Sequence, residues 1–423
     1  MIELTTAEIA ELTHGETRVE SVVTGVAIDS RRVAPGDLFV ALAGERADGA
    51  DFADDALAAG AAAALVPRGQ EGPGRIAVDD PLDALAVVAR EVRLRGTASV
   101  VGITGSTGKT STKDILAALC LPTARTVAAE ASYNNEIGVP LTLCRLEEDT
   151  EVCILELAMR GFGQIAELAA IARPEIGAVT NVGPVHLELV DSLEGVARAK
   201  GELIAALPPA GTAIVPSDFP VARNDVDVVR IGEPAAERID GRTVVGGVSF
   251  NFTARHQVQN AATALAALDA LGLPRPETVE VDFARWRGEE DELPGGGLLI
   301  NDAYNANPVS MRAALSYLVE RAGPRRRVAI LGDMAELGRT GPQYHREVGE
   351  AAAELGVDEL LAVGQLSRGY LEGGVSGRWV ANVHDALRQV DDLVRPGDAV
   401  LVKASRAVGL EAVAEALTKI PTR

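Results

Sequence analysis

The sequence is poor in aromatic residues, and its basic residues do not offset its acidic ones. Phe, Trp and Tyr make up only 3% of the 423 residues, so its hydrophobic cores must be built from Ala, Val, Leu and Ile. The formal net charge is −21, and no run of Lys or Arg offsets it. This balance argues against a nucleic-acid-binding protein and is more typical of simple solubility.

Cysteine is also scarce, and long apolar runs are missing. Cys120, Cys144 and Cys153 are an odd number, lack metal-site spacing and lie in apolar runs. They indicate buried thiols in a reducing compartment. The first residues, MIELTTAEIAEL, show no basic-then-apolar signal pattern, and charge, Gly or Pro interrupts every alanine-rich stretch. We therefore expect a cytoplasmic, soluble protein without a membrane span.

What the sequence does contain is a repeated alternation of apolar strands, Gly-rich turns and helices. This alternation is typical of mainly parallel sheets covered by helices. We predict an α/β protein of three domains: a small N-terminal α/β domain (1–96), a central domain with a mainly parallel sheet (97–275) and a C-terminal Rossmann-like domain (276–423). The Pro-containing segment 274–276 is the expected hinge, and 218–252 resembles a short antiparallel excursion.

A glycine-rich loop follows the first apolar strand of the central domain and opens a helix. In the run Gly105-Ser106-Thr107-Gly108-Lys109-Thr110, glycines allow backbone N–H groups to point at phosphate oxygens. The helix N-terminus and Lys109 add positive charge, and the Thr110 hydroxyl can bind magnesium. The usual spacing would place Gly at Ile103, so the match is imperfect. No guanine-reading N-K-x-D motif follows, which leaves a kinase or a ligase rather than a GTPase.

Three charged or polar residues follow this loop at informative positions. Glu156 ends the apolar run VCILEL, where a carboxylate can hold a metal beside the loop; a solvated strand end is the alternative. His186 follows IGAVTNV, although a lone His is more often structural. Lys200 has apolar neighbours three and four residues away on its helix. Burial would lower its pKa, and the neutral amine could react with carbon dioxide to give a carbamate; a snorkelling Lys is the alternative.

Two amide-containing segments can be interpreted either as site or as scaffold. Asn134 and Asn135 precede a Gly-Val-Pro turn, and their amides could contact phosphate or substrate, or belong to an ordinary polar loop. Asn307 stands before Pro308, which is the pattern of a helix N-cap followed by Pro at the first helical position. Part of the run YNANP is therefore expected to be structural.

Together these motifs resemble the Mur ligase family over nearly the whole chain. The motifs that carry the resemblance are DSR with PGDLFVALAGERADGADF, TGSTGKT, NNEIGVP, RHQVQNAATALAAL, NDAYNANPVSMRAAL, LGDMAELG and LVKASR. The runs NDAYNANPVSMRAAL and LGDMAELG are most similar to the members that join D-alanyl-D-alanine to a UDP-N-acetylmuramoyl-tripeptide. The resemblance implies a uridine-nucleotide domain, a central P-loop ATPase domain and a mobile C-terminal domain.

The resemblance also implies roles for individual residues. It implies ATP contacts for Gly105, Ser106, Thr107, Gly108, Lys109, Thr110, Asn134, Asn135, His256, Asn260, Arg287 and Asp302. It implies catalysis by Lys109, Glu156, His186 and Lys200, and metal binding by Thr110, Glu156, His186 and Lys200 as its carbamate. Ser30 and Arg31 would contact the UDP substrate. The amine-substrate region would include Tyr304, Asn305, Asn307, Asp333, Met334, Glu336, Lys403, Ser405 and Arg406.

The implied activity is that of an ATP- and Mg²⁺-dependent amide ligase in peptidoglycan precursor synthesis. The substrate carboxylate would attack the γ-phosphate, and the amine of the dipeptide would attack the resulting acyl phosphate. Its partners would be small molecules, with no nucleic acid or membrane, and the enzyme would be a monomer. Two alternatives remain: a related ligase acting on another carboxylate and amine, and a nucleotide-binding partner protein without turnover.

Overall fold

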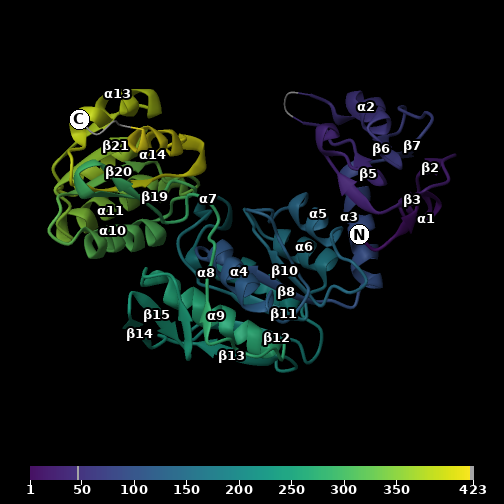
Figure 1. Ribbon diagram of the computed structural model, residues 1–423, viewed down its shortest axis with the longest axis horizontal. Helices are drawn as coiled ribbons and strands as arrows, with labels where there is room; N and C mark the ends of the chain where they lie inside the picture. Colours follow the sequence, from purple (N-terminus) through teal and green to yellow (C-terminus); the bar gives the residue numbers. More distant parts are fainter. Residues whose placement is uncertain (45–46, 420–423) are drawn as a thin grey trace.

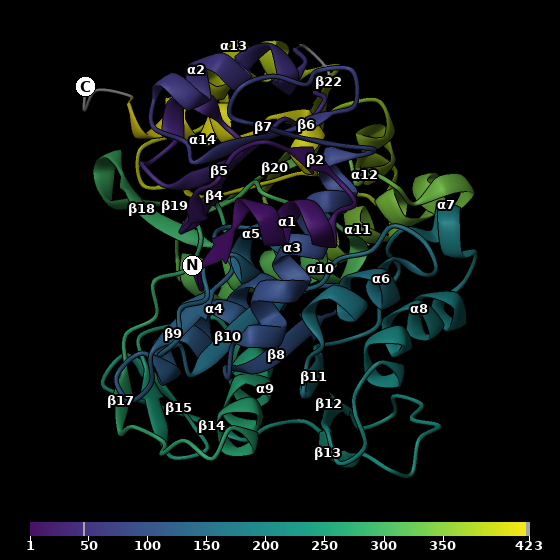
Figure 2. The same ribbon diagram turned by 90° about the vertical axis from the view of Figure 1, so that its right-hand side faces the viewer.

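The computed structural model describes residues 1–44 and 47–419 and divides them into three α/β domains. In Figure 1 the N-terminal domain (purple) and the C-terminal domain (green to yellow) stand above opposite ends of the central domain. Figure 2 shows the central domain beneath both of them from the side. The expected α/β class and the parallel central sheet are confirmed. Residues 420–423 of the expected C-terminal domain lie outside the described residues.

The N-terminal domain has a five-stranded sheet in the order β2-β7-β6-β5-β4, parallel except at β2. Its strands are short and rich in Ala and Val, so a small core is covered by helices of modest length. The last helix, α3, begins with the Asp80 side chain capping Leu82 and with Pro81 at its first turn. The elements are β1 (Leu4–Thr5), α1 (Thr6–Leu12), β2 (Glu16–Thr17), β3 (Val22–Val23), β4 (Gly25–Ala27), β5 (Asp37–Val40), α2 (Ala53–Ala58), β6 (Ala63–Pro67), β7 (Arg75–Val78) and α3 (Pro81–Arg95).

The central domain is built on a six-stranded parallel sheet in the order β13-β12-β11-β8-β10-β9. Its inner strands are apolar along their length because helices cover both faces. Helices α4 and α9 pack on one face, and α6 and α8 on the other. The elements are β8 (Ser99–Thr104), α4 (Lys109–Cys120), β9 (Thr126–Ala128), α5 (Gly138–Leu143), β10 (Val152–Glu156), α6 (Gln164–Ala172), β11 (Ile176–Val179), α7 (Leu187–Val190), α8 (Leu193–Ala205), β12 (Thr212–Pro216), β13 (Asp227–Ile231) and α9 (His256–Ala270).

The segment 218–252 is only partly the expected antiparallel excursion. Its first strand, β13, is parallel to β12 and forms the edge of the central sheet. The antiparallel part is limited to β14 (Ala236–Ile239), β15 (Arg242–Val245) and β16 (Val248–Phe250), joined by the parallel strand β17 (Thr278–Val279). Alternating apolar and charged residues do not distinguish an exposed parallel edge strand from a hairpin strand, which explains the error.

The crossing into the C-terminal domain lies beyond the boundary expected at 275/276. Strand β17 pairs with β16, and Val279 and Val281 belong to the core around α4 and α9. The Ala284 N–H is still bonded to the central domain, whereas the Gly288 N–H donates to Asn301 in the C-terminal domain. The connection is therefore made by residues 285–287, and the Pro-containing segment 274–276 is an irregular loop within the central domain.

The C-terminal domain has a six-stranded sheet in the order β18-β19-β23-β20-β21-β22, parallel except at β18. Asp302 and Lys403 end neighbouring parallel strands in register, so both reach the same sheet edge. The elements are β18 (Glu289–Leu293), β19 (Gly297–Asp302), α10 (Pro308–Ala322), β20 (Arg327–Gly332), α11 (Gly341–Glu354), β21 (Glu359–Val363), α12 (Gly369–Glu372), β22 (Gly377–Val380), α13 (Val383–Leu393), β23 (Ala399–Lys403) and α14 (Glu411–Thr418).

The three cysteines are buried as expected. Burial raises the pKa of Cys120, Cys144 and Cys153 to about 12, which keeps their thiols protonated and unreactive. Over residues 1–44 and 47–419, no helix combines the length and apolar character that a membrane crossing requires.

Arg93 joins the N-terminal domain to the central domain. Its Nε donates to the Ala172 carbonyl over 3.0 Å, and its terminal nitrogen contacts the Arg173 carbonyl and Glu175. The side chain of Arg93 is only 9% exposed. A cation from α3 therefore caps the carbonyl end of α6, where the helix dipole favours positive charge.

Replacing Arg93 with Met should lower the free energy of unfolding by about 2 kcal/mol, because buried carbonyls and Glu175 lose their donor. Urea unfolding measures this change. Arg90→Met, an exposed position on the same helix, is the matched control and should unfold like the wild type. Equal stability of the two variants would contradict the assigned role of Arg93.

Candidate active site

The glycine-rich loop between β8 and α4 depends on two glycine conformations. Gly105 has φ = 154° and Gly108 has φ = 79°, both in regions that favour glycine. A Cβ atom at Gly108 would also lie 2.2 Å from the Asn260 side-chain oxygen. The loop consequently presents the start of α4 to its surroundings, with Lys109 as the first helical residue.

Asn181 holds this loop in place and was missed in the sequence. Its side-chain oxygen accepts from the N–H groups of Ser106 (3.1 Å) and Thr107 (2.9 Å), and its amide nitrogen donates to the Thr107 hydroxyl. Two of the loop's N–H groups are thus paired within the protein, leaving the start of α4 to face a phosphate. The signal was the polar Thr180-Asn181 pair directly after the buried strand β11.

Thr110, Glu156 and Asn134 form one hydrogen-bonded group. The Thr110 hydroxyl donates to one oxygen of Glu156 over 2.8 Å, and the Asn134 amide donates to the other over 2.8 Å. Glu156 is buried at the carboxyl end of β10. The prediction that Glu156 lies beside the phosphate loop is therefore confirmed in its geometry.

Arg287 reaches the same group from the interdomain connection. Its guanidinium donates to the Thr110 hydroxyl over 3.2 Å and lies 4.1 Å from the centre of the Tyr304 ring. The Nε of Arg287 is buried and has no hydrogen-bond partner among the residues of the described ranges. A buried donor without a partner beside a phosphate loop favours an anionic ligand. The Tyr304 ring therefore packs against the Arg287 guanidinium, and this contact explains its position without a contact to the amine substrate.

A cavity of about 250 Å³ lies between the phosphate loop, α9 and the C-terminal domain. It unites central-domain and C-terminal residues that the sequence places up to almost 300 positions apart. The predicted residues that line it are Ser106, Thr107, Gly108, Lys109, Thr110, His256, Asn260, Arg287, Asp302, Asn305, Asn307 and Lys403. Gln257 and Gln259 line it as well and were not predicted, although they share the His256–Asn260 segment.

The C-terminal wall of this cavity is ordered by Lys403. Its ammonium donates to the Asp302 carboxylate over 2.6 Å and to the Asn305 carbonyl over 2.8 Å. Burial lowers the pKa of Lys403, and Asp302 counteracts part of that shift. Asn307 caps α10 by accepting from Ser310 N–H, and its amide also lies 3.4 Å from the Ser106 carbonyl. Asn307 is therefore both scaffold and cavity wall.

Positive charge exceeds negative charge around the phosphate loop. Burial lowers the pKa of Lys109, and Arg287 lowers it further while Glu156 raises it. The Lys109 ammonium donates to the Gly105 carbonyl over 2.9 Å. Burial, and then the nearby charge of Lys109, lower the pKa of Lys200 well below its usual value. A bound polyphosphate would offset this excess.

Lys200 lies on α8 and is 2% exposed. No carboxylate lies within ion-pair distance of it among the residues described here. A buried amine without a counter-ion favours its neutral form, as its lowered pKa indicates. The expectation of an apolar helical environment for Lys200 is confirmed, and the carbamate remains a prediction.

His186 faces the C-terminal domain. Its Nδ1 lies 2.6 Å from a Glu336 oxygen, a contact that is close but not aligned as a hydrogen bond. His186 lowers the pKa of Glu336, which Arg160 also approaches at 3.8 Å. Both His186 and Glu336 have positive φ. Sequence spacing did not predict that a candidate metal-binding residue and a candidate amine-site residue touch each other.

Several residues assigned to the site make structural contacts, and their ligand roles remain predictions. The Asn135 oxygen accepts from Ile137 and Gly138 N–H at the start of α5. The Asp333 carboxylate accepts from Gln365 and Ser367 N–H. Met334 is fully buried, and the Ser405 hydroxyl accepts from Ala335 N–H. A polar residue in a motif can order a loop through backbone bonds, which composition does not distinguish from ligand contact.

Arg406 lies at the edge of the site. It pairs with Glu411 at 2.8 Å, and its guanidinium lies 4.4 Å from the centre of the Trp286 ring. Trp286 belongs to the interdomain connection. Arg406 therefore links the end of β23 to that connection, and a contact with substrate is not needed to explain its position.

The candidate UDP residues are remote from the phosphate loop. The Arg31 side chain is 86% exposed and pairs with Asp29 at 2.7 Å, and this contact lowers the pKa of Asp29 to about 2. A small cavity of about 150 Å³ between the N-terminal and central domains is lined by Asp29 and Arg32 but not by Ser30 or Arg31. Arg32 is thus a further candidate that sequence reasoning overlooked.

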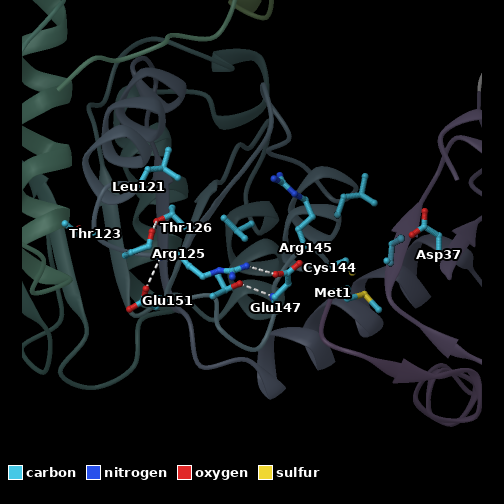
Figure 3. A pocket seen from close by; sticks show the side chains of 16 residues that line it. Met1, Asp37, Leu121, Thr123, Arg125, Thr126, Cys144, Arg145, Glu147 and Glu151 are labelled. Atoms are coloured by element: carbon cyan, nitrogen blue, oxygen red, sulfur yellow. Dashed lines mark hydrogen bonds and ion pairs between the residues drawn. The ribbon is translucent and has the colours of Figure 1, made fainter. Parts of the chain in front are cut away.

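A larger cavity of about 830 Å³ adjoins this small cavity at the same domain interface and shares Val26, Leu141 and Arg145 with it (Figure 3). Figure 3 shows Met1 and Asp37 on the N-terminal domain facing Arg125 and Arg145 on the central domain. Arg125 pairs with Glu147 at 2.8 Å. The lining comes from the amino ends of β9 and β10, opposite the end that carries Glu156, so this cavity is separate from the candidate active site.

Comparison with known proteins identifies the same three parts. Residues 22–93 match the description "Mur ligase family, catalytic domain", residues 103–268 the "Mur ligase middle domain", and residues 287–406 the "Mur ligase, glutamate ligase domain". The third match begins at Arg287, in agreement with the interdomain connection at 285–287.

Full-length relatives and solved structures are also similar to this chain. The UDP-N-acetylmuramoyl-tripeptide–D-alanyl-D-alanine ligase of Mycobacterium tuberculosis is 36% identical, with 99% of this chain and 98% of the relative covered. A crystal structure of MurF from Acinetobacter baumannii has a TM-score of 0.88 at 28% identity and covers 99% of both chains. MurF ligase from Thermotoga maritima in complex with ADP has a TM-score of 0.78 at 28% identity, covering 94% and 97%.

Replacing Lys109 with Ala should leave the fold intact, because the side chain is only half-buried at a loop-to-helix junction. Loss of one positive charge at a transferring phosphoryl group should lower ATP turnover on the order of a hundredfold or more. ADP release measures turnover, and circular dichroism checks the fold. A folded variant with near-normal turnover would exclude the loop as the ATP site.

Proposed function

This chain belongs to the Mur ligase family, and we propose that it joins D-alanyl-D-alanine to UDP-N-acetylmuramoyl-tripeptide, forming ADP and phosphate from ATP. The proposal rests on similarity to ligases of that name along the whole chain. The structural observation that carries it is the single cavity lined by the phosphate loop and by Arg287, Asp302 and Lys403.

The cavity explains how two anions can be brought together. The tripeptide carboxylate must approach the γ-phosphate of ATP, so the site needs concentrated positive charge. Lys109 and Arg287 supply that charge from two sides, with the buried Nε of Arg287 available for an anion. The carboxylate oxygen attacks phosphorus to give an acyl phosphate, and ADP leaves.

Closure against the C-terminal domain protects the second step. An acyl phosphate is hydrolysed by water, so a cavity between domains favours attack by the amine instead. The amine nitrogen attacks the carbonyl carbon and loses a proton as the amide bond forms, and phosphate leaves with the electrons of the broken C–O bond. We assign the amine side to the loops of the C-terminal domain that carry Tyr304 and Glu336, because they face the central domain at this point.

Thr110 and Glu156 are suited to hold Mg²⁺. Their oxygens lie 2.8 Å apart beside the phosphate loop, and hard oxygen ligands are those that Mg²⁺ prefers. No group of three His, Cys, Asp or Glu residues with metal-site geometry occurs among the residues described, but Mg²⁺ in such sites is bound largely by phosphates and water. When bound, the ion would supply further positive charge at the phosphate oxygens.

Lys200 would contribute to a second metal site as its carbamate. Its burial and lowered pKa favour the neutral amine that reacts with carbon dioxide. The product is an anion, which would offset the nearby positive charge of Lys109. His186 would be a further ligand of that site, and in this structure its Nδ1 lies 2.6 Å from Glu336.

The binding site of the UDP group, the oligomeric state and the cellular location complete the proposed function. We assign the UDP group to the N-terminal domain, with Ser30, Arg31 and Arg32 as its contacts. One chain supplies every residue assigned to the site, so we propose a monomer. We also propose that it acts in the cytoplasm, because the proposed reaction consumes ATP and the three cysteines are free thiols. A non-catalytic nucleotide-binding protein would not need Lys109, Glu156, His186 and Lys200 together, and a ligase for an unrelated acceptor would not need the N-terminal domain.

A panel of acceptors tests the proposed reaction. Phosphate release and amide product are measured with D-alanyl-D-alanine and a set of UDP-N-acetylmuramoyl-tripeptides that differ in their third residue. Product should form with at least one tripeptide and should require the UDP group and the dipeptide. Equal turnover with free acids that lack UDP would instead favour the alternative ligase, and ADP without amide would contradict ligation.

Changing Lys200 to Ala should remove most turnover while the protein stays folded, since Ala fits an apolar helix face. A small carboxylic acid such as formate should restore part of the activity by replacing the carbamate. Carbon-13 NMR of the wild type under labelled bicarbonate should show a carbamate signal that Lys200→Ala lacks. Absence of that signal in active enzyme would falsify the carbamate role.

A further inference from the structure

Helix α4 carries a charged pair that the reaction scheme does not use. Lys113 and Asp114 lie three and four positions after Thr110, so both are on the same face of the helix as Thr110. Lys113 is 4% exposed, and the Asp114 side chain is 11% exposed. Their charged ends lie 2.8 Å apart. Buried charges must be paired and hydrogen-bonded, so their further partners show what they position.

Asp114 binds the start of the interdomain connection. Its second carboxylate oxygen accepts from Ala284 N–H over 3.0 Å. On the other side, the Tyr304 N–H lies 3.4 Å from the Trp286 carbonyl. The connection is thus anchored at Ala284 and at Trp286, and Arg287 is its last residue. Since Arg287 donates to Thr110, the carboxylate one helical turn away fixes the chain segment from which Arg287 extends.

Lys113 binds the segment that leads to Asn134. Its ammonium donates to the Ala129 carbonyl over 2.8 Å, directly after strand β9. Asn134 lies five residues further on and donates to Glu156. Glu156 also accepts from Thr110 on the same helix. The lysine and the carboxylate therefore hold two different segments whose side chains converge beside the phosphate loop.

We infer that Lys113 and Asp114 are positioning residues: Asp114 sets Arg287, and Lys113 sets Asn134, against the phosphate loop. The inference rests on the proposed function, because Arg287 and Asn134 matter through ATP-dependent ligation. Neither Lys113 nor Asp114 lines the cavity that holds the phosphate loop. Their effect is indirect, and coupling to a second residue is what distinguishes it from general stabilisation.

A double-mutant cycle tests the link between Asp114 and Arg287. Asp114→Ala should lower kcat on the order of tenfold, because a displaced charge stabilises the transferring phosphoryl group poorly. Arg287→Ala should lower it on the order of a hundredfold. The double variant should be no worse than Arg287→Ala within about threefold, since Asp114 acts through Arg287. If the kcat loss of the double variant equals the product of the two single losses, Asp114 acts independently of Arg287 and the inference is overturned.

Controls separate positioning from folding. Asp114→Asn keeps an oxygen that can accept from Ala284 and should recover most of the kcat lost in Asp114→Ala. Asp391→Ala, at an exposed position on α13, should behave like the wild type. If Asp114→Ala does not fold, the comparison of Asp114→Asn with Asp114→Leu takes its place. No recovery in Asp114→Asn would contradict the assigned hydrogen bond.

The second arm pairs Lys113→Met with Asn134→Ala, and the same non-additivity is expected. Binding of trinitrophenyl-ATP is measured for all variants of both cycles. If the wild type makes no amide product, the proposed function fails, but coupling in nucleotide binding still tests the positioning. If ligation occurs and both cycles are additive in kcat and in binding, only the positioning inference fails.

Discussion

The Thr110 hydroxyl connects the parts of the candidate active site through two hydrogen bonds. It donates to Glu156 on β10 and accepts from Arg287 at the interdomain connection, while its backbone belongs to the first turn of α4. One small side chain thus joins the phosphate loop, the central sheet and the path to the C-terminal domain. A movement of the C-terminal domain that shifts Arg287 would change the surroundings of this hydroxyl.

Charge explains why the site is divided between domains. Lys109 comes from the central domain, Arg287 from the connection and Lys403 from the C-terminal sheet, with Glu156 and Asp302 as the carboxylates hydrogen-bonded among them. Buried like charges repel strongly at low dielectric. A polyphosphate with its metal would stabilise the closed arrangement by offsetting this excess, so binding and closure favour each other.

Many motif residues serve the scaffold as well as the site. Asn307 caps α10 and lines the cavity, and the Asp333 carboxylate binds backbone N–H groups of the next loop. Asn181 occupies two N–H groups of the phosphate loop itself. The loops that surround the ligands are therefore held by short polar side chains, because a loop without regular secondary structure must satisfy its backbone groups in another way.

The sequence alone determined the α/β class, the parallel central sheet, the phosphate loop and the burial of Lys200, because these follow from local periodicity and from residue types at strand ends. It did not determine the position of the interdomain crossing, since β17 joins the central domain only by pairing with β16. Nor did it separate Asn134, which contacts Glu156, from Asn135, which caps a helix. Only the tertiary structure decided which distant side chains meet, such as His186 with Glu336 and Arg287 with Thr110. Such contacts depend on how domains pack, and no local pattern in a sequence encodes the relative position of two chain segments far apart.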